Sequence, residues 1–145
     1  MRITFITGYP GAGKTTYAES TGRVTYDMDL LADALDYGRK TRKAREVAGK
    51  LLIGFISAAE AAGAHHINVI KTTPTPVEVL QRHEMEFVEI QRPIEECKAC
   101  RPMITPESWN RIILIHENWL KNNRHKTISI PAERWKRANP PGSKI

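Results

Sequence analysis

Short runs of β-branched and aromatic residues alternate along this chain with longer segments whose apolar residues recur at helical spacing. The short runs predict strands at residues 2–7, 23–26, 66–70, 86–91 and 127–130. The intervening segments predict helices at residues 14–20, 30–37, 42–62, 75–83, 93–100 and 106–122. Strands that alternate with helices need crossover connections, so we expect an α/β fold in which helices sandwich a parallel sheet of about five strands.

A glycine-rich segment follows the first predicted strand. It reads Gly8, Tyr9, Pro10, Gly11, Ala12, Gly13, Lys14 and Thr15, which matches the pattern G-x-x-x-x-G-K-[ST] of a phosphate-binding P-loop. Glycines permit positive φ angles and let backbone N–H groups approach phosphate oxygens, and the following helix adds its N-terminal dipole. We expect Lys14 to contact the β- and γ-phosphates, Thr15 to contact Mg²⁺ and Thr16 to contact the α-phosphate. The segment therefore predicts a nucleoside triphosphate site in a P-loop NTPase fold.

Two carboxylates, Asp27 and Asp29, follow the second predicted strand. Ligands of a parallel sheet gather at the carboxyl ends of its strands, so these side chains can face the γ-phosphate. One of them can accept a proton from an attacking hydroxyl, while the other orders the metal or caps the helix that begins at Leu30. The alternative is that both aspartates only cap this helix.

Three segments resemble the kinase domain of the phage polynucleotide kinase family. They read FITGYPGAGKTTYAES, TYDMDLLADAL and EFVEIQRPIEECKACRPMITPESWNRIILIHENWL, within residues 3–122. The resemblance implies ATP-dependent transfer of the γ-phosphate to a hydroxyl, in that family the 5′-OH of a nucleic acid. It also implies that Asp29 is the general base and that Arg101, in a short lid before Pro106, is the cation that stabilises the transferring phosphate. Lys98 or Arg92 would assist Arg101.

The sequence departs from this family on the acceptor side. The family's arginine for the acceptor phosphate would fall near Ala32, and its acidic residue after the third strand is replaced by Lys71, Thr72 and Thr73. Three functions therefore stay open. The chain is a kinase for nucleic acid 5′ ends, a kinase for a nucleoside, nucleotide or other small hydroxyl acceptor, or a nucleotide-binding module without phosphate transfer.

Composition and charge add a question about partners. The chain has 145 residues, a length for which we expect one kinase domain at 1–138 and a flexible tail at 139–145. Lys+Arg 22 against Asp+Glu 16 gives a net charge of +6. The cations gather in two clusters, Arg39 to Arg45 and residues 121–137. Either cluster can attract the 5′ end of DNA or RNA, or be a solvated surface. Trp135 can stack a base, pack in the core, or join Ile130, Pro131 and Ala132 beside the adenine.

The remaining signals are weaker. No run approaches the roughly 20 apolar residues of a membrane helix, and we expect a cytoplasmic protein that does not bind membranes. Cys97 and Cys100 have C-x-x-C spacing without a second pair, which favours plain helix thiols over a metal or redox site. Three of the five histidines, His65, His66 and His116, are assigned no chemistry. Trp109 and Trp119 lie on the apolar stripe of the last helix and should pack in the core.

Overall fold

The computed structural model describes residues 1–39, 41–71 and 83–131. Within them, five strands form one sheet in the order β2-β3-β1-β4-β5, and every neighbouring pair is parallel. The strands are β1 (Arg2–Thr7), β2 (Thr25–Asp27), β3 (His66–Ile70), β4 (Glu84–Gln91) and β5 (Lys126–Ser129). The predicted parallel α/β sheet is therefore confirmed.

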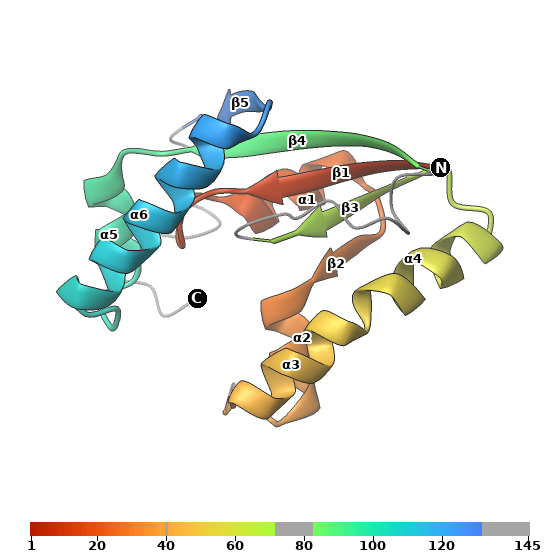
Figure 1. Ribbon diagram of the computed structural model, residues 1–145, viewed down its shortest axis with the longest axis horizontal. Helices are drawn as coiled ribbons and strands as arrows, with labels where there is room; N and C mark the ends of the chain where they lie inside the picture. The colour runs from red at the N-terminus through yellow and green to blue at the C-terminus, as the bar shows by residue number, and fades with distance from the viewer. Residues whose placement is uncertain (40, 72–82, 132–145) are drawn as a thin grey trace.

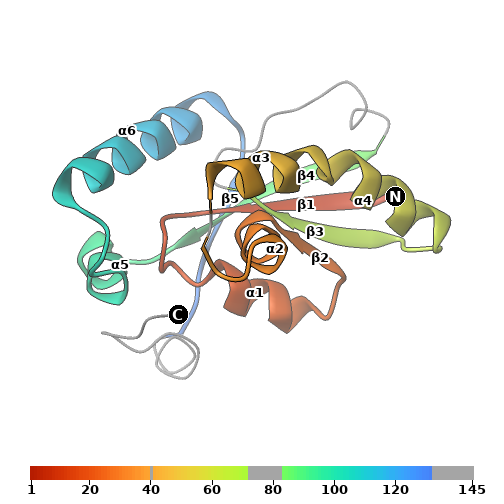
Figure 2. The same cartoon turned by 90° about the horizontal axis from the view of Figure 1, so that it is seen from below.

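Helices cover both faces of this sheet (Figures 1 and 2). They are α1 (Lys14–Thr21), α2 (Met28–Leu35), α3 (Arg42–Lys50), α4 (Leu52–Ala61), α5 (Ile94–Cys100) and α6 (Pro106–Asn122). Alternate residues of β1 point to opposite faces. Ile6 packs with Ala18 of α1, whereas Ile3 and Phe5 pack with Leu52 of α4 and its neighbours. On this second face α6 also packs against the sheet, because the ring centroids of Trp119 and Phe87 lie 5.6 Å apart.

The predicted helix at 42–62 is wrong in one respect, because it is divided at Leu51. The Leu51 N–H is shared between the carbonyls of Val47 and Ala48, at 3.1 and 3.2 Å, and Leu51 forms a turn between α3 and α4. Gly49 and Gly54 flank this turn, and glycine lowers the helix propensity on both sides.

Most other boundaries agree with the prediction or shift by one residue. Shifts of two residues concern the start of β4, which is Glu84 instead of 86, and two further elements: β2, which occupies Thr25–Asp27 instead of 23–26, and α2, which occupies Met28–Leu35 instead of 30–37. The reason for the early start of α2 is that Asp27 itself caps the helix. The predicted helix at 75–83, apart from its last residue, and the predicted tail at 139–145 lie outside the described residues. In the part of the chain that is described, no helix is long and apolar enough to span a membrane.

Candidate active site

The glycine-rich segment forms a loop between β1 and α1, as the sequence predicts. Gly8, Gly11 and Gly13 have φ angles of 154°, 82° and 102°. These angles suit glycine because it has no Cβ. Close packing adds a second requirement at Gly8, where a Cβ would lie 2.8 Å from the carbonyl oxygen of Ile90. Gly13 precedes the first residue of α1, so the unpaired N–H groups of this helix end join the loop. The loop therefore has the geometry of an anion-binding site.

Lys14 is the residue on which the charges of the site converge. Its Nζ donates a hydrogen bond to the carbonyl of Gly8, at 2.9 Å. Burial lowers the pKa of Lys14, the carboxylates of Asp29 and Asp27 act in the opposite direction, and the guanidinium of Arg101 lowers it further. These effects need proximity. The structure therefore places Asp29 and Arg101, the other two predicted catalytic residues, within electrostatic reach of Lys14.

Asp27 and Asp29 differ in what their side chains do. Oδ1 of Asp27 accepts hydrogen bonds from the backbone N–H groups of Asp29 and Leu30, at 3.1 and 3.3 Å, and so caps α2. Burial raises the pKa of Asp27, and the nearby charge of Asp29 acts in the same direction. Asp29 lies exposed in the first turn of α2 and does not cap it. Asp27 thus caps α2 and Asp29 does not, whereas the prediction that Asp27 also orders a metal stays a prediction.

Two oxygen groups beside the loop suit a magnesium ion. Thr15 is exposed in the first turn of α1, and Asp27 ends β2, while Thr16 is buried. Mg²⁺ prefers hydroxyl and carboxylate oxygens, keeps several waters and takes its other ligands from phosphates. Among the described residues no group of three or more His, Cys, Asp or Glu could hold a metal. Thr15 and Asp27 therefore fit a metal that is held jointly with a nucleotide.

Arg101 follows α5 and begins the short link to α6. Its Nη1 donates to the carbonyl of Cys100 at 2.9 Å, and Thr105 closes the link by capping α6 at the Ser108 N–H. A cleft of about 240 Å³ lies beside this link. It is lined by Lys98, Arg101, Pro102, Ile104, Pro106, Trp109 and Asn110. Lys98 lies near Glu95, with 4.0 Å between Nζ and Oε1. The expected lid therefore corresponds to α5 and the link that follows it.

Arg92, which the sequence offers as an assistant of Arg101, is placed differently. Its side chain is buried, and Nη1 donates to the carbonyl of Gly11 at 2.8 Å and to Sγ of Cys100 at 3.3 Å. Nε lies 3.7 Å from a carboxylate oxygen of Glu96. The expectation that Arg92 assists with the transferring phosphate is not supported, because its guanidinium joins the P-loop to α5 instead.

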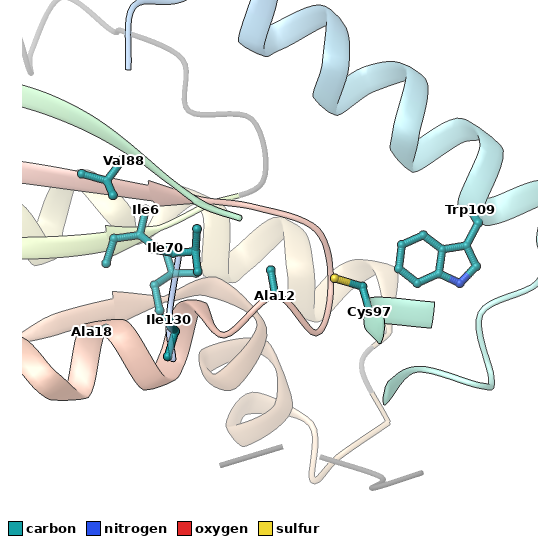
Figure 3. Close-up of a cluster of buried hydrophobic side chains, with 9 residues drawn as sticks. Ile6, Ala12, Ala18, Ile70, Val88, Cys97, Trp109 and Ile130 are labelled. Carbon is teal, nitrogen blue, oxygen red and sulfur yellow. The ribbon is translucent and has the colours of Figure 1, made fainter. Parts of the chain in front are cut away.

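The two cysteines belong to the same contact. Both are thiols buried in α5, and burial raises the pKa of Cys97 to about 11. A Cβ on Gly11 would lie 3.1 Å from the carbonyl oxygen of Cys97 and 3.2 Å from Cβ of Cys100, so glycine allows this approach. Figure 3 shows the sulfur of Cys97 directed toward the P-loop that carries Ala12, with Trp109 of α6 on the other side of Cys97, and all three belong to one buried cluster. The thiols pack the P-loop against the lid.

The structure shows a cluster of aromatic, histidine and acidic side chains at the P-loop that the sequence does not predict. The ring of Tyr9 packs against the ring of His116, with 4.7 Å between centroids, and Nε2 of His116 lies 3.0 Å from Oε2 of Glu89. Helical periodicity places His116 among the buried residues of α6, as expected for Trp109 and Trp119, which are also buried. Its partner Glu89 comes from a strand that is distant in sequence, and no local pattern shows that contact.

The two basic clusters lie at different places. In the first cluster, Arg39, Arg42, Lys43 and Arg45 are exposed on the loop and helix that follow α2, the helix that carries Asp29. In the second, Lys121, Arg124 and Lys126 precede or begin β5, and Nζ of Lys126 lies 3.4 Å from Glu86. The P-loop follows the carboxyl end of β1 and Asp29 that of β2, while Arg101 follows α5, the helix after β4. Lys40 and residues 132–137, including Trp135, lie outside the described residues.

The structure shows the surroundings of Ala32 and Lys71, the two positions at which the sequence differs from the phage polynucleotide kinase family on the acceptor side. Ala32 is completely buried in a cluster with Ala44 and Ala48 of α3, so α2 and α3 pack closely where the family has an arginine. Lys71 follows β3, and its backbone N–H donates to the carbonyl of Ile6 at 3.1 Å. The P-loop thus agrees with the sequence pattern, whereas neither of these two positions carries the group that the resemblance implies for the acceptor.

Comparison with known proteins identifies the fold. No family model and no curated sequence matches the chain. A chain of the Pnkp1/Rnl/Hen1 RNA repair complex is similar in structure, with a TM-score of 0.66 and 16% identity over 86% of this chain, which spans 47% of that one. Shikimate kinase from Acinetobacter baumannii gives 0.59 and 15%, covering 94% and 87% of the two chains. A sugar kinase from Janibacter sp. gives 0.55 and 20%, covering 95% and 92%. The chain therefore has the fold of P-loop kinases.

Proposed function

We propose that the protein is an ATP-dependent kinase that transfers the γ-phosphate to a hydroxyl. The observation that carries the proposal is the convergence of Asp29, Arg101 and Lys14 beside the P-loop. A loop that binds phosphates needs only the backbone and the lysine. An exposed carboxylate and a guanidinium at the same place are the additional groups that phosphoryl transfer requires.

Each group has one role in the transfer. The P-loop N–H groups and Lys14 hold the phosphates, and Asp29 accepts the proton as the acceptor oxygen bonds to the γ-phosphorus. The bond from that phosphorus to the bridging oxygen breaks and ADP leaves, while Arg101 stabilises the charge on the moving phosphoryl group. Thr15 and Asp27 would hold Mg²⁺, which neutralises charge on the phosphates when it is bound.

We infer that the acceptor is the 5′-OH of a nucleic acid. The support is the placement of the first basic cluster, since Arg39, Arg42, Lys43 and Arg45 are exposed and follow the helix that carries Asp29. Nucleic acid backbones are bound mainly through such cations. The similarity to a chain of an RNA repair complex is consistent with this acceptor.

A small hydroxyl acceptor is the second candidate, and a different observation favours it. The shikimate kinase and the sugar kinase are matched over nearly their whole lengths, 87% and 92%, so kinases of this size and fold include enzymes named for small acceptors. The burial of Ala32 adds support, because it removes the family's contact to an acceptor phosphate.

A single assay separates these functions. The protein is incubated with γ-labelled ATP and Mg²⁺, and 5′-OH DNA and RNA oligonucleotides are offered beside a panel of nucleosides, nucleotides and small alcohols. Label on the oligonucleotides supports the proposal, and label on small acceptors alone supports the second candidate. ATP binding without label on any acceptor would leave a nucleotide-binding module. Lys14→Ala is the matched control and should abolish transfer to every acceptor.

A further inference from the structure

The aromatic side chain of Tyr37, just after α2, is almost completely exposed to solvent. Tyr37 is 94% exposed, the highest value among the exposed large hydrophobic residues of the described chain. It follows α2, which ends at Leu35, and it lies beside the first basic cluster. Burial of apolar area normally removes tyrosine rings from water, so a ring in this position needs a reason.

The backbone makes tyrosine a costly residue here. Tyr37 has a φ angle of 58°, and it is the one residue other than glycine with positive φ in the described parts of the chain. The N–H of Gly38 donates to the carbonyl of Asp33 at 2.9 Å, which places Tyr37 at the left-handed position of a helix C-terminal motif. Glycine is usual at this position because a Cβ is unfavourable there. Tyrosine therefore occupies a strained position without gaining burial.

Cations follow the tyrosine along the chain. Nε of Arg39 donates to the carbonyl of Asp36 at 3.0 Å, which holds the guanidinium stem against the same turn. Arg42 and Lys43 begin α3 a few residues later, with side chains that are 94% and 85% exposed. Exposed aromatic rings among cations are the surface on which single-stranded nucleic acids bind, because the ring stacks a base while the cations contact phosphates.

The distance between Tyr37 and Asp29, the candidate general base, suits this role. Tyr37 follows Asp29 by eight positions, which corresponds to about 12 Å along α2 at about 1.5 Å per residue. A stacked strand rises about 3.4 Å per nucleotide. The ring would therefore meet a base about three or four nucleotides from a 5′ end held at Asp29.

We propose that Tyr37 is a base-stacking platform that binds the acceptor strand a few nucleotides from its 5′ end. This inference rests on the proposed nucleic acid acceptor, and it names single strands as the substrate class. Four exposed cations follow the ring in the sequence, Arg39, Arg42, Lys43 and Arg45, against one exposed carboxylate, Glu46, which lies 3.6 Å from Arg42 and 3.8 Å from Lys43. This excess of positive charge favours a polyanion over an apolar protein partner. The shared chemistry of DNA and RNA strands is what the surface would recognise.

The test uses variants that separate the ring from the strain. Tyr37→Gly and Tyr37→Asn remove the ring and suit the left-handed backbone, whereas Tyr37→Phe keeps the ring. Leu114→Ala is the matched control, because it removes an exposed apolar side chain from α6. Anisotropy of labelled single strands of about ten nucleotides, DNA and RNA, gives binding without requiring transfer. Thermal melts give stability.

The expected result is a pair of opposite changes. Tyr37→Gly should melt a few degrees above the wild type and bind the strands about tenfold more weakly, whereas Tyr37→Phe should bind like the wild type. Equal binding by Tyr37→Gly and the wild type would overturn the inference. Wild-type protein that binds no strand would overturn it as well. A dimer that Tyr37→Gly dissociates, without strand binding, would show a protein interface instead. Label transfer to small acceptors in the panel assay would then leave the kinase proposal standing.

Discussion

Asp29 is the residue at which the proposed chemistry is easiest to isolate. Its carboxylate is exposed in the first turn of α2 and is not used as the helix cap, which Asp27 supplies. We expect Asp29→Asn to keep ATP binding and to lower transfer by about 10²-fold to 10⁴-fold, the usual contribution of a general base. Initial rates with labelled ATP and nucleotide binding by calorimetry measure the two quantities separately.

The matched control for this variant is Asp33→Asn, which changes a carboxylate one helical turn later in α2. It should transfer phosphate at a rate close to that of the wild type. Full activity of Asp29→Asn would show that another group takes the proton. Loss of ATP binding by Asp29→Asn would instead assign the carboxylate to the nucleotide.

Single residues differ in how far the sequence predicts them. The P-loop residues and Asp29 are predictable because their chemistry depends on short spacing and on the end of a strand. Arg92 is not, since its role depends on a contact with Gly11, 81 positions away. From the local pattern Arg92 was expected to assist at the transferring phosphate, but its side chain is buried and donates a hydrogen bond to a backbone carbonyl instead.

At the scale of elements, Arg92 connects β4 and α5 to the P-loop. Hydrogen bonds of charged groups typically contribute about 1.5–3 kcal/mol, so Arg92→Met should lower the free energy of unfolding by about that amount. The same change loosens Gly11, and we expect the KM for ATP to rise. Lys98→Met, a partly exposed position on α5, is the control and should change stability little. Equal melting temperatures for Arg92→Met and the wild type would contradict the role.

The contact between α6 and β4 predicts an acid-sensitive fold. Burial lowers the pKa of His116, and the hydrogen bond and charge of Glu89 only partly oppose this effect. The unfolded chain therefore takes up a proton near pH 6.5 that the folded chain refuses, and the free energy of unfolding falls as the pH drops below that value. Burial also lowers the pKa of His66, which adds to the same trend.

Urea melts across a pH series measure this dependence. His116→Gln should show a shallower loss of stability below about pH 6.5 than the wild type, whatever its stability at neutral pH. The remaining slope should shrink further when His66→Gln is added. Parallel curves for His116→Gln and the wild type would mean that the buried histidine is protonated in the fold.

Elements were predictable where one periodicity extends over many residues. The apolar stripe at residues 106–122 is an example, because it predicts α6 and its members Trp109, His116 and Trp119 are all buried. The division of α3 from α4 at Leu51 was not predictable, since the apolar spacing continues through the turn. At this turn the Leu51 N–H donates to the carbonyls of both Val47 and Ala48, a backbone feature that a pattern of side chains does not record.

At the scale of the molecule, alternation of strands and helices predicts a parallel sheet but not the order β2-β3-β1-β4-β5. That order comes from which strands pair, and Ile3 and Phe5 of β1 are buried centrally between β3 and β4. The strand order also determines where the two basic clusters lie. The first basic cluster follows β2 and Asp29 on the carboxyl side, while Lys121 and Arg124 precede β5.

This asymmetry predicts how salt should act on the acceptor. If phosphates of a single strand contact the first cluster, the logarithm of its affinity falls linearly with the logarithm of salt, with a slope of about −0.7 per phosphate. Arg42→Gln combined with Arg45→Gln should reduce the steepness of that slope by about 1.4. Lys121→Gln combined with Arg124→Gln is the matched control, because it removes the same charge from exposed positions before β5.

Oligonucleotide KM values over a range of potassium chloride concentrations give the slopes of both double variants. A reduced slope in the first variant alone would place the strand along α3, next to the helix that carries Asp29. A reduced slope in the second variant alone would move the strand to the cluster at residues 121–137, and the acceptor would then reach the P-loop from the β5 side. A slope near zero in the wild type would contradict a polyanionic acceptor, because two exposed clusters on a chain of net charge +6 cannot bind a strand without releasing its counterions.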